Sequence, residues 1–181
     1  LLAMLSMMSA GCIALLAGKK RKKNMKDSEM IELCLGIACK AHKGQIDKVG
    51  LPVILHPIHV GEMGNSTEEI CVGFLHDTIE DTDMTYDKLL SLGVRKDIAD
   101  SVCVLTHKKG VPYFDYIQSI IDSKDMVAIQ VKINDLDHNL SRAKKYGFQK
   151  QYEKCTTALS MMGRFFPHEE GQYYPSFEYI P

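Results

Sequence analysis

Apolar residues recur every three or four positions through most of the chain, which is the spacing of one face of an α-helix. In the first such stretch, Ile31, Cys34, Leu35 and Ala38 would share a face. Alternating patterns typical of strands are nearly absent. The periodicity predicts one helix between Ser66 and His76, and others over residues 27–41, 57–63, 86–92, 95–106, 112–123, 125–140 and 149–166.

Residues that begin and end helices support these boundaries. Ser66 followed by Glu69 has the spacing of a capping box. Thr85 is suited to cap the helix that Gly93 would end, and Pro112 is suited to a first helical turn. The segment from 42 to 52 contains two glycines and predicts a loop. We therefore expect an all-α, multi-helix bundle.

Length and charge divide the chain into three parts. Its 181 residues are enough for one domain, which we place at 27–166, followed by an irregular aromatic tail at 167–181. The net charge of −1 argues against a uniformly basic nucleic-acid binder, so no nucleic-acid partner is expected. Six of the 22 basic residues lie within 19–26, whereas all 23 acidic residues lie after them. The predicted domain is therefore acidic.

The first 26 residues form a leader with two alternative interpretations. Leu1–Ala17 is almost wholly apolar and uncharged, and a basic run follows it. This order is that of a short membrane anchor with a cytoplasmic domain behind it, not that of a secretory signal peptide. The other interpretation is an artefactual leader. Because the six cysteines form no C-x-x-C pair, we expect a reducing, cytoplasmic setting, with membrane contact only through residues 1–26.

A cluster of ionisable residues follows the predicted helix after Ser66. His76 and Asp77 are followed by Glu80 and Asp81, and three acids with a histidine in six residues are costly beside a buried segment unless something pairs with them. A divalent cation would explain the cluster, and a solvated acidic helix end is the plainer alternative. Two more potential ligands lie on separate predicted helices. His42 is at the end of one, and Asp135 lies in another, which also carries Asn139.

These residues lie in motifs that resemble the HD-domain phosphohydrolases. The closest resemblance is to the (p)ppGpp hydrolase domain of RelA/SpoT homologues and to small standalone SpoT-like hydrolases. The matching motifs follow the family's order over about residues 28–145: AHKGQ at 41–45, KxGxP at 48–52, HP at 56–57, FLHDTIEDT at 74–82, VKIxD at 131–135 and HN at 138–139.

The resemblance implies a metal-dependent enzyme that removes the 3′-pyrophosphate of the guanosine alarmones (p)ppGpp. It implies one divalent cation of the Mn²⁺ type, two acids that handle the attacking water, and substrate contacts by an asparagine. The implied ligands are His42, His76, Asp77 and Asp135, the acids are Glu80 and Asp81, and the asparagine is Asn139. Lys48, Lys40 and Lys132 are further candidates for phosphate contact, whereas His56 is expected to brace its loop.

Three of the departures from the family pattern change the charge of the site. Asp47 and Leu136 stand where related hydrolases often carry a basic residue, and Asp137 is an added acid. Two alternatives to alarmone hydrolysis therefore stay open. One is an HD phosphohydrolase that acts on another nucleotide, and the other is a non-catalytic nucleotide-sensing module. The oligomeric state is not indicated.

Overall fold

The computed structural model describes residues 25–163, and the predicted leader and aromatic tail lie almost wholly outside this range. Within it the secondary structure is helical, apart from an isolated bridge between Ile46 and Pro52, so the predicted all-α bundle is confirmed. The helices are α1 (Asp27–Ala41), α2 (Leu55–Glu62), α3 (Thr67–Leu75), α4 (Thr78–Asp81), α5 (Tyr86–Ser91), α6 (Lys96–Leu105), α7 (Tyr113–Ser123), α8 (Met126–Tyr146) and α9 (Gln149–Gly163).

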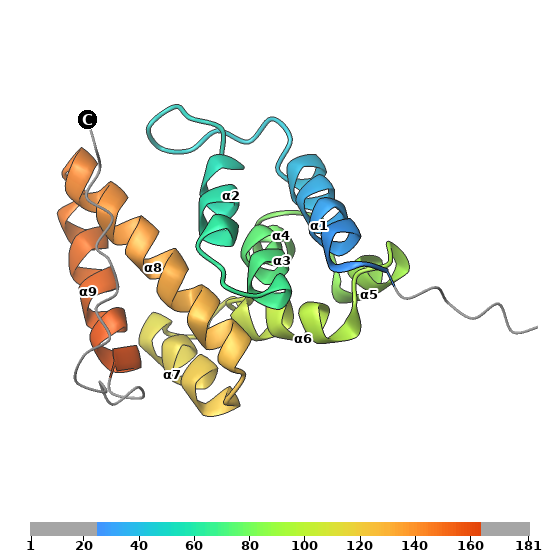
Figure 1. Ribbon diagram of the computed structural model, residues 1–181. Helices are drawn as coiled ribbons and strands as arrows, with labels where there is room; N and C mark the ends of the chain where they lie inside the picture. Colours follow the sequence, from blue (N-terminus) through green and yellow to red (C-terminus); the bar gives the residue numbers. More distant parts are fainter. Residues whose placement is uncertain (1–24, 164–181) are drawn as a thin grey trace, which may run out of the picture.

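Helix α3 is the centre of the bundle. It packs against α1, α2, α6 and α8, and its residues from Cys71 to Leu75 are all buried (Figure 1). A helix that is apolar all round requires partners on every side. Its first turn is fixed as the sequence predicts, because the Ser66 hydroxyl accepts a hydrogen bond from the Glu69 N–H at 3.1 Å. The central helix therefore delivers His76 and Asp77, which follow it, into the interior of the protein.

The structure differs from the predicted elements in two places. Helix α8 continues six residues beyond the predicted end at 140, to Tyr146, where Gly147 closes it in a left-handed conformation with φ of 71°. The short helix α4 is not predicted; Asp77 is its N-cap, and its first backbone bond runs from the Asp81 N–H to the Asp77 carbonyl at 2.9 Å. The longer α8 carries Arg142 beside the loop at 42–54, with consequences described below.

Helices α2 and α3 approach each other closely through two glycines. A Cβ atom added to Gly73 would lie 2.7 Å from the Gly61 Cα and 2.8 Å from the Gly61 nitrogen, so the backbone itself blocks a side chain there. We expect Gly73→Ala to lower the free energy of unfolding by about 3 kcal/mol, at the upper end of the range for overpacked cores. Urea unfolding would measure the loss.

A matched glycine provides the control. Gly36 lies within α1, and a Cβ atom added there would meet nothing within 4 Å. Gly36→Ala should therefore raise the free energy of unfolding by roughly 0.5–1 kcal/mol, because alanine has the higher helix propensity. Similar effects of the two substitutions would show that the contact between α2 and α3 is not tight.

None of the helices between residues 25 and 163 is long and apolar enough to cross a membrane. The five cysteines in this range are free thiols.

Candidate metal centre and substrate cleft

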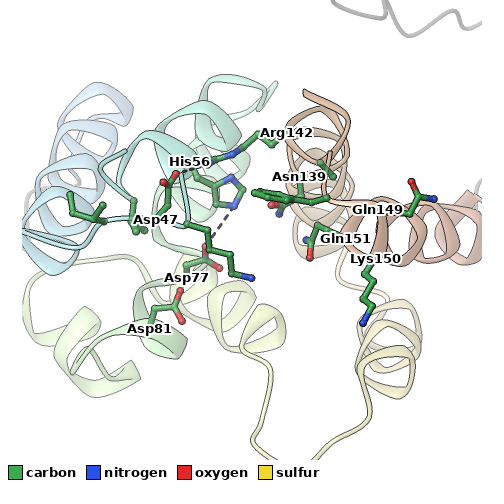
Figure 2. Close-up of a pocket in the computed structure, with 14 residues that line it drawn as sticks. Asp47, His56, Asp77, Asp81, Asn139, Arg142, Gln149, Lys150 and Gln151 are labelled. Atoms are coloured by element: carbon green, nitrogen blue, oxygen red, sulfur yellow. Dashed lines mark hydrogen bonds and ion pairs between the residues drawn. The ribbon is translucent and has the colours of Figure 1, made fainter. Parts of the chain in front are cut away.

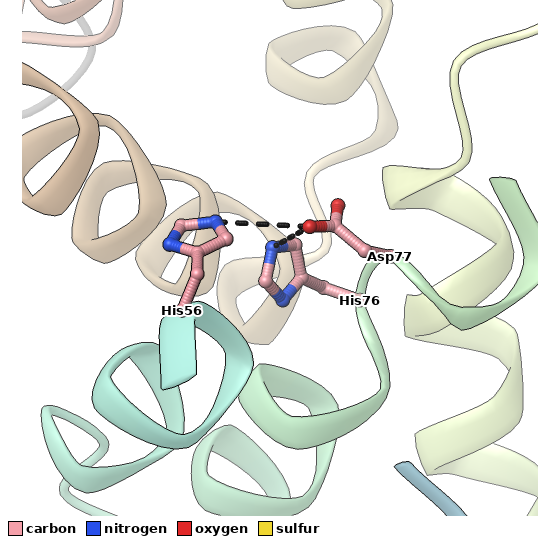
Figure 3. Close-up of side chains that lie close together, drawn as sticks. All are labelled: His56, His76 and Asp77. Atoms are coloured by element: carbon pink, nitrogen blue, oxygen red, sulfur yellow. Dashed lines mark ion pairs between the residues drawn. The ribbon is translucent and has the colours of Figure 1, made fainter. Parts of the chain in front are cut away.

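Three side chains from two elements form a potential metal site within the described part of the chain. His56 lies in the first turn of α2, and His76 and Asp77 follow the C-terminus of α3. One ligand atom from each of the three lies within 4.8 Å of the others. The two glycines between α2 and α3 make this approach possible. Figure 3 shows both imidazole rings and the Asp77 carboxylate turned toward one another.

The hydrogen bonds of His76 leave one ring nitrogen available for a cation. Its Nδ1 donates to the Gly73 carbonyl at 2.7 Å, because a carbonyl oxygen only accepts. Its Nε2 is buried, has no hydrogen-bond partner, and lies 3.1 Å from Asp77 Oδ2. A buried nitrogen without a partner is costly, and metal-binding histidines commonly hold the other nitrogen on a carbonyl in this way. The residues present therefore fit a divalent cation.

The charges around His76 favour a proton at this position. Burial lowers the pKa of His76, but the carboxylates of Asp77 and Asp135 outweigh it and raise the pKa to about 9. Burial likewise opposes ionisation of Asp77, yet His76 holds the pKa of that carboxyl below its usual range. The cluster is thus arranged to stabilise positive charge at its centre.

His56 is connected to a second histidine from α8. Its Nε2 lies 3.0 Å from Asp135 Oδ1 and 3.7 Å from Asp77 Oδ2, and its Nδ1 lies 2.6 Å from His138 Nδ1. Burial lowers the pKa of His138 to about 3, so that ring is neutral. A proton on His56 Nδ1 that is donated to His138 leaves the Nε2 lone pair facing the carboxylates, which is the tautomer a cation requires.

Asp135 borders the cluster and is held by three partners. Lys132 donates to its Oδ2 at 2.8 Å, and Asn139 donates to its Oδ1 at 2.6 Å, where His56 also approaches. Burial alone would raise the pKa of Asp135, but the Lys132 ammonium and His56 hold it well below its usual range. Asp135 Oδ1 lies 3.8 Å from His76 Nε2, so this predicted ligand is next to the cluster.

His42, a predicted ligand, is buried at the C-terminal end of α1. Its Nδ1 lies 2.7 Å from Gln45 Oε1, and the Gln45 amide in turn donates to the Asp81 carbonyl at 3.0 Å. Like His76, His42 is buried and leaves its Nε2 without a hydrogen-bond partner, as a ligand would, although the ligand atoms grouped within 4.8 Å of one another are those of His56, His76 and Asp77. His56, expected to brace its loop, is thus an added candidate, and the assignment of His42 as a ligand stays a prediction.

Two cavities meet at the cluster. The larger, of about 750 Å³, is lined by Lys48, His56, Asp81 and residues around the turn between α8 and α9 (Figure 2). The smaller, of about 360 Å³, is lined by Glu80, Lys132 and Lys154 among others. Asp77 and Asn139 line both. A ligand placed on the cluster can therefore extend in two directions.

The predicted acidic pair is divided between these cavities. Asp81 faces the larger one, and burial together with the charges of Asp77 and Glu80 raises its pKa. Glu80 lines the smaller one, where its Oε2 accepts a hydrogen bond from the His107 N–H at 2.9 Å. Glu80 and Asp81 therefore line different cavities, although they are adjacent in the sequence.

The predicted phosphate-binding lysines are also placed separately. Lys48 lines the larger cavity and Lys132 the smaller. Lys40 is exposed in the last turn of α1 and lines neither cavity. Lys154, which the sequence does not single out, lies 4.3 Å from the Tyr113 ring centre in the smaller cavity.

Known proteins with similar sequences include GTP pyrophosphokinases and a 3′-pyrophosphohydrolase. A GTP pyrophosphokinase of Myxococcus xanthus is 30% identical over an alignment of 140 residues, which covers 69% of this chain and 18% of that protein. A GTP pyrophosphokinase of Streptomyces coelicolor is 26% identical over 166 residues, covering 82% and 19% respectively. A guanosine-3′,5′-bis(diphosphate) 3′-pyrophosphohydrolase of Aquifex aeolicus is 39% identical over 66 residues, covering 34% and 10%. The chain is homologous to the RelA/SpoT proteins.

The homologous region is a small part of those proteins, since the chain spans about a fifth of the length of the first two RelA/SpoT relatives. No family model matches it. Among solved structures, a metazoan orthologue of SpoT described as hydrolysing ppGpp aligns with a TM-score of 0.56 at 18% identity, covering 77% of this chain and 97% of that one. The helical fold is thus that of a SpoT-like protein.

Proposed function

We propose that this RelA/SpoT homologue is a metal-dependent phosphohydrolase that removes the 3′-pyrophosphate of (p)ppGpp. The observation that carries the proposal is the His56–His76–Asp77 cluster, which combines a buried imidazole nitrogen without a hydrogen-bond partner, on His76, with the Asp77 side chain, which lines both cavities. The similarity to the Aquifex 3′-pyrophosphohydrolase supports the choice of reaction and substrate.

The cation, which we propose to be Mn²⁺, would be held by His56, His76 and Asp77, with Asp135 beside them. When bound, such a cation lowers the pKa of a coordinated water and polarises a phosphoryl oxygen. Lys132 and Asn139 keep Asp135 ionised and oriented through the hydrogen bonds described above. His42 holds Gln45 and, through it, the backbone of Asp81, and its buried, unpartnered Nε2 keeps it a candidate for a further ligand.

Asp81 is the candidate for the group that orients the attacking water or takes its proton. The pKa of Asp81 is raised and so lies closer to neutral pH than that of an ordinary aspartate. A general base is most effective when its pKa lies near the working pH. Glu80, fixed by the His107 N–H, is placed to assist from the smaller cavity. Lys132 and Lys154 supply positive charge to the same cavity, where we place the departing pyrophosphate.

A direct assay tests the hydrolase proposal. The full chain with Mn²⁺ should release pyrophosphate from ppGpp, and Glu80→Gln combined with Asp81→Asn should lower turnover by at least a thousandfold, because removal of such groups costs 10² to 10⁴ each. Circular dichroism should show an unchanged helical content in the double variant. Absence of pyrophosphate release across a range of Mn²⁺ concentrations would refute the alarmone activity.

A second substrate class is favoured by Asp47, which lines the larger cavity where related hydrolases often carry a base. In this alternative, the same site hydrolyses a different nucleotide. A panel of nucleoside 3′- and 5′-phosphates assayed beside ppGpp separates the two, since the alternative requires one of them to be turned over with a higher kcat/KM than ppGpp.

A further inference from the structure

An ion pair joins the loop at 42–54 to α8 at the edge of the larger cavity. The Arg142 guanidinium donates to Asp47 Oδ2, while Asp47 Oδ1 accepts hydrogen bonds from the Val49 and Leu51 N–H groups at 2.9 Å each. Both carboxylate oxygens are thus occupied. Because the backbone of its own loop fixes Asp47, the guanidinium that it pairs with is fixed as well.

Arg142 lies on the far side of His56 from the acidic residues of the site. Figure 2 shows Asp77 and Asp81 below the imidazole ring and Arg142 above it. Lys48 and Lys150 line the same cavity. The wall of the cavity thus carries three basic side chains as well as carboxylates.

The guanidinium has hydrogen-bonding capacity that the described residues do not use. It carries five N–H donors, and within residues 25–163 its hydrogen bonds go to Asp47 alone. The Tyr146 ring, 6.0 Å from its Cζ, contacts the charge without accepting a conventional hydrogen bond. The Arg142 side chain is 23% exposed, so the remaining donors are partly shielded from water at the cavity wall.

We propose that Arg142, positioned by Asp47, is a specificity-determining residue that binds a phosphate group of the nucleotide other than the one that is hydrolysed. This inference rests on the proposed function, because it places the scissile group at the His56–His76–Asp77 cluster. For ppGpp the group at Arg142 is the 5′-diphosphate.

The chemistry of the pair supports a phosphate ligand. Guanidinium donors match phosphate oxygens in bidentate geometry, and an arginine held in place before binding loses less entropy than a free one. Repulsion from Asp47 is weak, because its charge is balanced by Arg142 and two backbone N–H groups, and Lys48 and Lys150 add positive charge. The volume of about 750 Å³ is within the range of small-molecule sites.

The acidic residue at position 47 is therefore not simply the loss of a phosphate contact. A base at position 47 would contact the ligand from the loop, whereas here the loop supplies the acid and α8 supplies the base. The additional turns of α8 beyond residue 140 are what bring Arg142 to this position. Asp47 is therefore a positioning residue, and the positive charge has moved from the loop to the helix.

Titration of the full, Mn²⁺-loaded chain with GDP and with guanosine tests the assignment. GDP supplies a 5′-diphosphate without a 3′ group, and guanosine lacks all phosphates. Arg142→Gln should weaken GDP binding by about tenfold, as expected for loss of a charged hydrogen bond, and leave guanosine binding unchanged. Arg142→Lys should recover part of the loss. Lys144→Gln, an exposed charge on the same helix, is the matched control and should bind both ligands like the wild type.

The outcomes separate this inference from the hydrolase proposal. The inference would be overturned if wild type and Arg142→Gln bound GDP with equal affinity. It would also be overturned if the substitution weakened GDP and guanosine binding equally, or if the wild type did not bind GDP more tightly than guanosine. A chain that shows Arg142-dependent GDP binding but releases no pyrophosphate from ppGpp would refute the proposed reaction and leave the phosphate contact standing. Thermal unfolding of each variant excludes misfolding as the cause.

Discussion

Replacing His56 by glutamine is expected to abolish stoichiometric Mn²⁺ binding and, with it, hydrolysis. His56 supplies one of the three ligand atoms that lie within 4.8 Å of one another, and its Nε2 faces the carboxylates of Asp77 and Asp135. Residues that only support metal ligands already change affinity by 10- to 100-fold when removed, so loss of a ligand should weaken binding by at least a hundredfold. Calorimetric titration of the chelator-treated protein with MnCl₂ measures this directly.

His42→Gln is the matched comparison, because it removes the histidine that motif resemblance favours as the ligand. The variant should lose the hydrogen bond to Gln45 and some stability, since His42 is 2% exposed, but its folded fraction should retain more Mn²⁺ affinity than His56→Gln, because His42 is not among the three grouped ligand atoms. A variant series in which His42→Gln loses the ion and His56→Gln retains it would reverse our assignment. Thermal unfolding at the titration temperature establishes the folded fraction.

The helical fold is predictable from sequence because its signals are local. Apolar spacing, Ser66 and Thr85 as caps, and Pro112 before α7 act within a few residues of where they stand. The end of α8 is not predicted, because the stretch after residue 140 is polar and its periodicity is weak. Gly147, whose left-handed φ of 71° closes the helix, is the signal that would have extended it.

The composition of the site is less predictable, because it depends on how helices approach one another. Sequence alone identifies His76 and Asp77, since a histidine and acids after a buried helix require compensation. It does not identify His56, which reaches His76 only because Gly61 and Gly73 allow α2 and α3 to touch. A glycine in each of two adjacent apolar helices is a weak but available signal for such a contact. The ion pair of Asp47 with Arg142 spans 95 positions and has no local signal.

Chelator-treated protein is expected to lose about 3 kcal/mol of unfolding free energy between pH 6.5 and 9. The cause is His76, whose pKa rises from 6.5 to about 9 on folding, and each unit of pKa shift corresponds to about 1.4 kcal/mol. Below pH 6.5 both the folded and the unfolded states hold this proton, and its full stabilisation is present. As pH rises toward 9, only the folded state keeps the proton, so the advantage declines until the folded state also releases it.

Urea unfolding of wild type and His76→Asn in EDTA, at intervals from pH 6 to 9.5, isolates this contribution from other titrating groups. The difference in unfolding free energy between the two proteins should shrink with rising pH, and a pH-independent difference would contradict the raised pKa.

The same proton on His76 links stability to metal binding. Because a cation must displace it from Nε2, apparent Mn²⁺ affinity should rise by up to tenfold per pH unit below 9, while the ion restores the stability that the proton provided. A proton on His76 then stabilises the site at low pH, and the cation stabilises it at high pH. His76→Asn should lose the stabilisation by the proton and the stabilisation by the cation together.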